Sequence, residues 1–386
     1  MSKKRIWLSS PHMGGSEQKY IQEAFDTNWI APVGANIDAF ELDLENYLGS
    51  GYVTAVNTGT AAIHLGLVLL GVKAGDEVLC QSMTFSASAN PILYQGAIPI
   101  FIDSEPDTWN LCPTALEEAI VDRINKGVTP KAIIAVALYG VPYKIEEIRT
   151  IADKYAIPIL EDSAEALGSS YKGKRCGTFG DVGVLSFNGS KIITTSGGGA
   201  IITATKASKE RAIFLATQAK ENAPHYQHSE VGYNYRMSNV SAGIGRGQMN
   251  VLAEHIELRR EMHQFYVDLF KGINGVSVYT VPNKNYFANY WLTAILIDAT
   301  ETEGISNESI RLKLLEENIE SRPLWKPMHM QAIFRDYPYY GKDVAETLFD
   351  NGLLLPSGSN LSDDDRARIK TVFLNLFGKD KKRLGF

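Results

Sequence analysis

Residues 52–62, YVTAVNTGTAA, join a short apolar run to small polar residues that lead into a helical pattern. The run is continuous rather than alternating, which is typical of a strand covered on both faces, and such strands are usually parallel. Similar runs occur at 77–81, 98–102, 132–138, 158–161, 182–186 and 200–203, and helical patterns lie between them at 61–70, 114–125 and 145–155. This alternation predicts a βα-repeating sheet with parallel strands.

The pattern changes in the second half of the chain. Residues 240–270 predict one long helix, followed by a strand at 290–297 and a helix at 309–317. With 386 residues, of which 45% are hydrophobic and 21% charged, the chain is long enough for two cores. We therefore expect a large domain over residues 1–250 and a smaller C-terminal α+β domain over residues 251–386.

Composition excludes several classes of protein. The net charge of −6 gives no general attraction to nucleic acid, and no uninterrupted apolar run reaches the roughly 18 residues that suggest a membrane span. Cys80, Cys112 and Cys176 are odd in number and form no C-x-x-C pair, which argues against a disulfide framework and a metal site. The N-terminus lacks the apolar stretch of a signal peptide, so we expect a cytoplasmic protein with no membrane insertion. The basic tract 379–383 is expected to be a solvated tail.

Polar residues that follow the predicted strands are candidates for a ligand site, because ligands bind at the carboxyl ends of strands in open parallel sheets. Thr58, Gly59 and Thr60 precede a helix whose first N–H groups could bind an anion, although they could equally be ordinary capping residues. Residues 158–163, PILEDS, end a buried strand in two carboxylates, and their side chains must point to opposite faces. One of them faces the site and needs a cationic or hydrogen-bonded partner, unless it only caps the next helix.

Lys191 follows the run at 182–186 and a glycine turn, and residues 197–199 are all glycine. A lysine held in such a site could form a Schiff base with an aldehyde or ketone, whereas taken alone it could be a solvated loop residue. The order Gly189-Ser190-Lys191 is the reverse of a P-loop, and no G-x-S-x-G nucleophile elbow occurs.

Taken together, Thr58-Gly59-Thr60, Thr84-Phe85, Asp162-x-x-Glu165, Ser186-Phe187 and Lys191 resemble, in this order, the fold-type I pyridoxal-phosphate (PLP) enzymes. They are most similar to bacterial sugar-nucleotide aminotransferases, and the resemblance extends from Pro11 to Gly358. It implies an α/β fold with a mostly parallel central sheet and helices on both faces. It also implies that residues 1–250 form the PLP-binding domain with an N-terminal substrate arm.

The resemblance further implies a role for each motif residue. Lys191 would carry the cofactor as a Schiff base and move protons, and Asp162 would bond the pyridine nitrogen. Phe85 would stack on the ring, Ser186 would help to hold the phosphate, and Asn234 would reach in from the second subunit of a homodimer with shared active sites. The implied cofactor-binding set is Thr58, Gly59, Thr60, Phe85, Asp162, Glu165, Ser186, Asn188, Lys191 and Asn234.

One branch of the family resembles this chain in particular, the 4-aminotransferases of UDP-N-acetylbacillosamine synthesis. The resemblance lies in residues 188–199, 28–32 and 321–329, although many family members have Gln or His where Glu165 stands. It implies transfer of an amino group from L-glutamate to C4 of a UDP-linked 4-keto-6-deoxy sugar. The implied substrate-binding residues are Asn28, Trp29, Ile30, Ala31, Gly59, Ser186, Asn234, Arg322, Pro323, Leu324, Trp325 and His329.

Other functions remain open at this stage. The sugar carrier could be dTDP or GDP, because relatives of this type use all three nucleotides. An NAD-dependent sugar-nucleotide oxidoreductase would need a G-x-G-x-x-G turn after the first strand, and residues 57–62 do not supply one. A related sugar 3-dehydratase would have histidine in place of Lys191.

Overall fold

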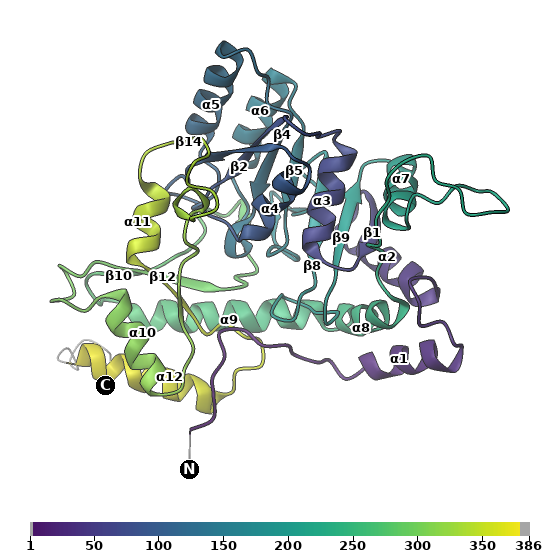
Figure 1. Cartoon of the computed structure of the whole chain (residues 1–386). Coiled ribbons are helices and arrows are strands. Elements are labelled where there is room, and N and C mark those ends of the chain that lie inside the picture. Colours follow the sequence, from purple (N-terminus) through teal and green to yellow (C-terminus); the bar gives the residue numbers. More distant parts are fainter. Residues whose placement is uncertain (1–2, 379–386) are drawn as a thin grey trace.

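The computed structural model describes residues 3–378, so the basic tract 379–383 lies outside the described residues. Its centre is an eight-stranded sheet, flanked by helices on both faces (Figure 1). The strands, in spatial order, are β1 (Tyr52–Val56), β9 (Gly199–Thr203), β8 (Val182–Ser186), β5 (Ile159–Asp162), β4 (Ala132–Val136), β2 (Glu77–Gln81), β3 (Ile98–Ile102) and β14 (Tyr339–Tyr340). The helices of this part are α1 (Glu17–Asp26), α2 (Ala35–Leu48), α3 (Gly59–Leu69), α4 (Ser86–Tyr94), α5 (Pro113–Asn125), α6 (Ile145–Tyr155) and α7 (Lys206–Ala216).

The continuous apolar runs are explained by burial on both faces of this sheet. In β2, Val78 and Cys80 pack in the cluster that contains α3, α4 and α7, whereas Leu79 packs with α5 and α6 on the opposite face. Every residue of β2 is buried. The predicted α/β architecture, with a mostly parallel sheet and helices on both faces, is confirmed.

The direction of β9 corrects the prediction that all these strands are parallel. β9 pairs antiparallel with both β1 and β8, while the pairs from β8 to β14 are parallel. Residues 187–198 connect β8 to β9 without a helix. Parallel strands are usually joined by a crossover helix, and this connection has none; β9 instead runs back beside β8, and Lys191 lies in the turn between them.

The helix predicted over 240–270 is two helices, α8 (Asn239–Met249) and α9 (Leu252–Phe270), which lie roughly end to end (Figure 1). The break falls at Asn250 and Val251, two residues with low helix propensity. The side chain of Asn250 donates from Nδ2 to Ser16 Oγ at 3.1 Å. This contact attaches the break to the N-terminal segment.

The remaining elements form two small sheets and the helices around them. The four-stranded sheet contains β10 (Val276–Val278), β12 (Thr293–Ile297), β15 (Gly352–Leu355) and β13 (Arg322–Pro323), packed by α10 (Asn307–Glu316) and α12 (Asp363–Phe377). The other sheet contains β11 (Tyr286–Phe287), β6 (Ser170–Tyr171) and β7 (Lys174–Arg175), and the short elements η1 (Leu138–Gly140), η2 (Met328–Met330) and α11 (Val344–Asn351) complete the set.

Segments far apart in the sequence meet in this region. Ile6 bridges to Ile319 and packs in the core of the four-stranded sheet, whereas β14 leaves the C-terminal part to pair with β3. A division of the chain after residue 250 falls at the break between α8 and α9, and it remains our proposal for the domain boundary.

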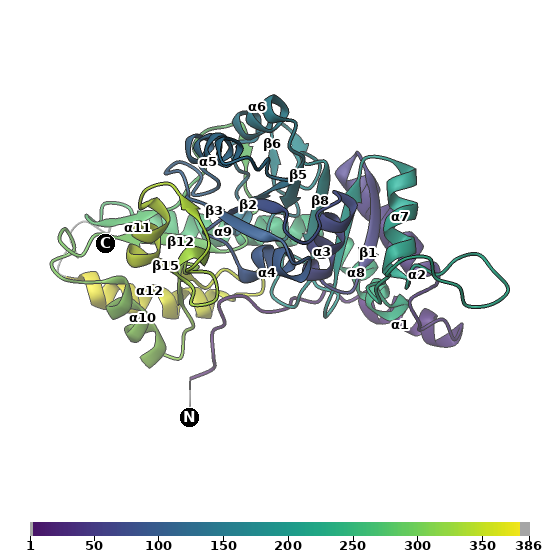
Figure 2. The ribbon, with the colours of Figure 1, turned by 45° about the horizontal axis from the view of Figure 1, so that its top comes forward.

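Figure 2 shows a long loop after α7 that projects from the end of the molecule near α1 and α2. Among residues 3–378, no helix has the length and apolarity needed to cross a membrane.

Candidate active site

A cavity of about 270 Å³ lies at the carboxyl ends of β1, β5 and β8. This is the edge of the sheet where parallel α/β proteins bind ligands. The residues that line it are Thr58, Gly59, Thr60, Ile63, Thr84, Phe85, Ala87, Ser88, Val136, Asp162, Ala164, Glu165, Ser186, Asn188, Ser190, Lys191, Gly197, Gly198, Trp291 and Trp325. The cavity therefore brings together nine of the ten predicted cofactor residues, all except Asn234.

One end of the cavity is the N-terminus of α3. Thr58 caps this helix by accepting from Ala61 N–H at 2.9 Å, so the capping alternative is realised for its hydroxyl. The first N–H groups of the helix, at Gly59 and Thr60, have no partner within the helix and are suited to an anion. Ser186 packs closely against this turn, since a Cβ placed on Gly59 would lie 2.9 Å from Ser186 Cβ.

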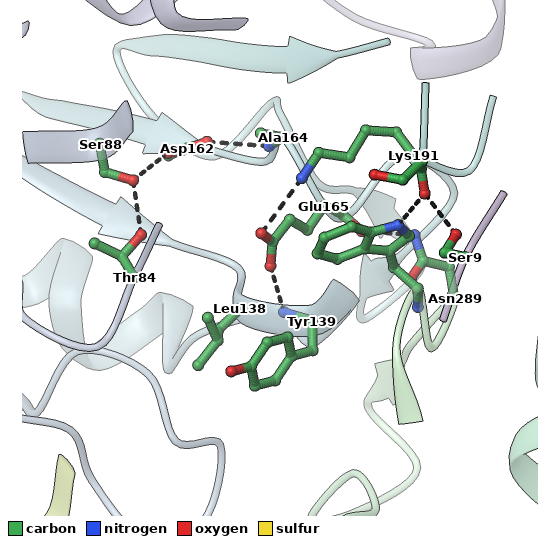
Figure 3. Close-up of polar contacts among 12 residues, drawn as sticks. Ser9, Thr84, Ser88, Leu138, Tyr139, Asp162, Ala164, Glu165, Lys191 and Asn289 are labelled. Atoms are coloured by element: carbon green, nitrogen blue, oxygen red, sulfur yellow. Dashed lines mark hydrogen bonds and ion pairs between the residues drawn. The ribbon is translucent and has the colours of Figure 1, made fainter. Parts of the chain in front are cut away.

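Asp162 lies at another wall of the cavity, at the end of β5. Its Oδ2 accepts from Ser88 Oγ at 2.7 Å and its Oδ1 from Ala164 N–H at 3.1 Å (Figure 3). Burial raises the pKa of Asp162, while the Ser88 hydroxyl, the Ala164 N–H and the charge of Lys191 act in the opposite direction. A cation next to this carboxylate would offset the cost of burying it.

Glu161 faces the other side of the sheet, as the strand alternation predicts. Its carboxylate accepts from the backbone N–H groups of Gly177, Phe179 and Gly180 and from Ser163 Oγ. It therefore fixes the loop after β7 and takes no part in the cavity.

Lys191 lies in the turn between β8 and β9, and its side chain is only 14% exposed. Its Nζ lies 3.3 Å from Glu165 Oε1, and Glu165 Oε2 accepts from Tyr139 N–H at 2.7 Å (Figure 3). Burial raises the pKa of Glu165, against the effect of the Lys191 charge. Lys191 is thus a largely buried amine beside a buried carboxyl, and the alternative of a solvated loop lysine is wrong.

Aromatic side chains form much of the remaining wall. The Trp325 ring lies 5.6 Å from Phe85, 5.8 Å from Tyr139 and 6.4 Å from Trp291, measured between ring centroids. Trp291 also contacts Lys191, whose Nζ lies 3.8 Å from the centre of the indole ring. Sequence reasoning missed Ser88 and Trp291, because a serine in a helix and a tryptophan beside a strand give no local signal of a site.

Several predicted substrate residues lie outside this cavity in the single chain. Asn28, Trp29, Ile30 and Ala31 form an exposed loop after α1, where Asn239 donates from Nδ2 to the Trp29 carbonyl at 2.6 Å. Arg322 and Pro323 are exposed in β13, and Arg322 pairs with Glu320. Asn234 is also exposed, and its carbonyl accepts from Asn57 Nδ2 at 3.1 Å.

Two further predicted residues do not line the cavity. The side chain of Leu324 is buried in the core, 2% exposed, so its expected contact with a substrate is corrected. This follows from alternation along the chain, since Trp325, the next residue, points into the cavity. His329 contacts Ser82 Oγ at 2.7 Å and Glu346 Oε1 at 3.1 Å, and therefore joins β2 to α11.

The donor set fits pyridoxal phosphate. The cofactor needs a phosphate site, a partner for its ring nitrogen and an amine within reach of its aldehyde. The α3 N-terminus, Asp162 and Lys191 provide these three groups around one cavity. The fit depends on glycine, because a Cβ on Gly199 would lie 2.6 Å from Gly59 N and would push the phosphate turn out of place.

Comparisons with known proteins agree with this geometry. The model of the DegT/DnrJ/EryC1/StrS aminotransferase family matches residues 11–373. EpsN of Bacillus subtilis (strain 168) is 51% identical over 378 residues, covering 97% of this chain and 96% of EpsN. GDP-perosamine synthase of Escherichia coli O157:H7 is 37% identical over 378 residues, covering 98% of this chain and 100% of that enzyme. The crystal structure of DesI with its TDP-sugar product superposes with a TM-score of 0.86 at 26% identity, covering 99% of this chain and 95% of DesI.

Proposed function

The chain belongs to the DegT/DnrJ/EryC1/StrS aminotransferase family, and from that membership we propose that it transfers the amino group of L-glutamate to C4 of a UDP-linked 4-keto-6-deoxy sugar. Members of this family are PLP-dependent sugar aminotransferases that act on nucleotide sugars, which defines the class of enzyme and its cofactor. The observation that carries the proposal is the position of the Lys191 amine, in one cavity with Asp162 and the N-terminus of α3.

In this proposal each wall of the cavity has one task. When bound, PLP supplies an aldehyde that carries the amino group and a ring that stabilises negative charge. The N–H groups of Gly59 and Thr60, with the Ser186 hydroxyl, would bind the phosphate, and Asp162 would keep the ring nitrogen protonated. Lys191 would hold the aldehyde covalently.

The Lys191 amine would have a second task, as general base and acid. Its Nζ would move a proton between the substrate carbon and the cofactor carbon that carries the amino group, in one direction with the amino donor and in the other with the sugar. Glu165, 3.3 Å away and buried, orients Nζ and balances its charge. Phe85 lines the cavity with 54% of its surface exposed and would stack on the cofactor ring, and Trp325 lies 5.6 Å from it between ring centroids.

The residues outside the cavity suggest that a second copy of the chain completes the site. Asn234 and the loop at Asn28, Trp29, Ile30 and Ala31 are exposed, although the resemblance assigns them to cofactor and substrate. In a homodimer, these residues of each subunit would enter the cavity of its partner. This arrangement would explain why they are exposed in the single chain and yet are expected to bind cofactor and substrate. Arg322 is then a diphosphate partner that must exchange Glu320 for the ligand.

GDP as the nucleotide is a second candidate, and a specific observation favours it. GDP-perosamine synthase shares 37% of its residues with this chain over the whole length. The UDP proposal is supported by the resemblance of residues 188–199 and 321–329 to the bacillosamine branch. The two candidates differ in the base and share the keto group that reacts.

A two-step absorbance experiment tests both the reaction and the nucleotide. The PLP-loaded chain should show the visible band of lysine-bound cofactor, and L-glutamate without a sugar should remove that band. Only a UDP-linked 4-keto-6-deoxy sugar should then restore it, with an amino sugar detected by mass spectrometry. Restoration by the GDP-linked sugar alone would favour the second candidate, and no band in the PLP-loaded chain would refute the proposed function.

A further inference from the structure

Residues Asn289, Tyr290 and Trp291 form a strained turn that leads into β12 next to the cavity. Tyr290 has a φ of 46°, in the left-handed region that residues other than glycine rarely adopt. Buried Asn289 holds the turn: its Nδ2 donates to the Glu165 carbonyl at 2.9 Å, and its Oδ1 accepts from Trp291 N–H at 2.8 Å. Backbone strain that is fixed by several contacts is characteristic of functional sites.

The turn presents Trp291 to Lys191 in two ways. The Lys191 Nζ lies over the indole face at 3.8 Å from its centroid, and the indole Nε1–H donates to the Ser190 carbonyl at 2.6 Å. The first contact acts on the amine and the second on the backbone just before Lys191. Trp291 is only 4% exposed, so little water competes for either contact.

We propose that Trp291 is a positioning residue for Lys191, which holds the amine in place during the part of each cycle when it is free. This inference rests on the proposed function, in which Lys191 leaves and rejoins the cofactor in every turnover. A lysine side chain has one of the largest rotamer freedoms among the amino acids. Trp291 on one side and Glu165 on the other restrict that freedom and keep Nζ within reach of the reacting carbon.

The test follows capture of PLP by Lys191, which needs no substrate turnover. The full-length chain freed of cofactor is mixed with PLP, and the band of lysine-bound cofactor is followed by stopped flow. Trp291→Leu should form the band about tenfold more slowly at saturating PLP, because both the aromatic face and the N–H donor are lost. Trp291→Phe keeps an aromatic face and should recover most of that rate. In turnover, Trp291→Leu should lower kcat with little change in KM for L-glutamate.

A matched control separates positioning from general loss of structure. Trp109 is a buried tryptophan, 5% exposed, that stacks on Tyr279 at 3.9 Å and does not line the cavity. Trp109→Phe should lower the melting temperature and leave the capture rate unchanged. Equal capture rates in wild type and Trp291→Leu, with only the melting temperature reduced, would overturn the inference while the proposed function stands. Absence of the lysine band in the wild type would overturn both.

Fluorinated tryptophan gives a second test that keeps the fold intact, in case Trp291→Leu does not fold. Fluorination withdraws electron density from the ring face and weakens its attraction for a cation without changing its shape. Incorporation at all five tryptophans should slow capture by about threefold in the wild type and have no such effect in Trp291→Phe. An equal effect in both chains would contradict a role for the indole face of Trp291.

Discussion

Ser88→Ala removes the hydroxyl that supports the Asp162 carboxylate, and it tests the role of that carboxylate directly. Ser88 Oγ donates to Asp162 Oδ2 at 2.7 Å, and both side chains are buried. A hydrogen bond to a charged group contributes about 1.5–3 kcal/mol, so its loss should raise the pKa of Asp162 by favouring the protonated carboxyl to about that extent. Burial already raises this pKa, and the substitution acts in the same direction.

The expected effect on activity is confined to acidic pH. Asp162 must be ionised to pair with the protonated ring nitrogen, so the acidic limb of the kcat profile should move upward by about one pH unit or more. Activity on the alkaline side, where Asp162 is ionised in both proteins, should change little. The assay is the pH dependence of kcat with L-glutamate and the accepted keto sugar.

Stability without cofactor should change in a related way. For an acid whose pKa is higher in the folded chain, the free energy of unfolding is largest below the unfolded-state pKa and falls as pH rises through the folded-state pKa. Ser88→Ala raises the folded-state pKa further, so the additional loss of stability on going to neutral pH should be about 1.5–3 kcal/mol. Chemical denaturation at a series of pH values measures it.

Thr84→Val is the matched control. Thr84 Oγ1 is hydrogen-bonded to Ser88 Oγ at 2.7 Å, so it is linked to the Asp162 carboxylate only through Ser88. The substitution should shift the acidic limb by less than about half a pH unit, since the bond from Ser88 to Asp162 remains. If the acidic limb of Ser88→Ala coincides with that of the wild type, Asp162 is not the group whose ionisation supports the reaction.

Three further perturbations follow from the structure. Lys191→Ala should still bind PLP but lose the lysine band and at least about a thousandfold in transamination; near-normal turnover would exclude Lys191 as the cofactor lysine. Gly199→Ala should weaken PLP binding at least about tenfold, because its Cβ would lie 2.6 Å from Gly59 N. Gly189→Ala, with 3.9 Å to the nearest atom and no place in the cavity lining, should bind PLP normally in the same titration. Burial lowers the pKa of His255 from its usual value of 6.5 to about 4. Between these two pH values the unfolded chain binds more protons than the folded chain. The free energy of unfolding therefore falls as the pH falls through this range. The slope of the unfolding free energy against pH reports the number of protons taken up on unfolding, and in His255→Gln this number should be lower by roughly one. An unchanged slope would count against a neutral buried His255.

The sequence predicted the sheet well because each strand carries its own signal. Continuous apolar runs located β2, β3 and β8 to the residue, since burial on both faces leaves no alternation to misread. The direction of β9 was not predictable in this way. It depends on the absence of a helix between residues 187 and 198, which is a property of the connection rather than of the strand.

The candidate site was predictable where motif residues follow strands along the chain. Asp162 and Lys191 could be found because they end β5 and follow β8, at the edge where ligands bind. Ser88 and Trp291 could not, because their importance comes from contacts made across 74 and about 100 residues of chain. The exposed loop at Asn28–Ala31 is a different case, since a single chain lacks the surface that it is proposed to meet.

The contacts around the lysine turn join residues that are far apart in the sequence, which limits how early in synthesis these contacts can form. The Ser190 carbonyl accepts from Ser9 Oγ and from Trp291 Nε1, and Arg259 donates to the carbonyls of Lys191 and Ser357. During synthesis the ribosome must release almost the whole chain before these partners exist together. The contacts around the reactive amine can therefore be completed only late in synthesis, and contacts of such long range favour slow folding. Refolding experiments should recover secondary structure well before they recover cofactor capture.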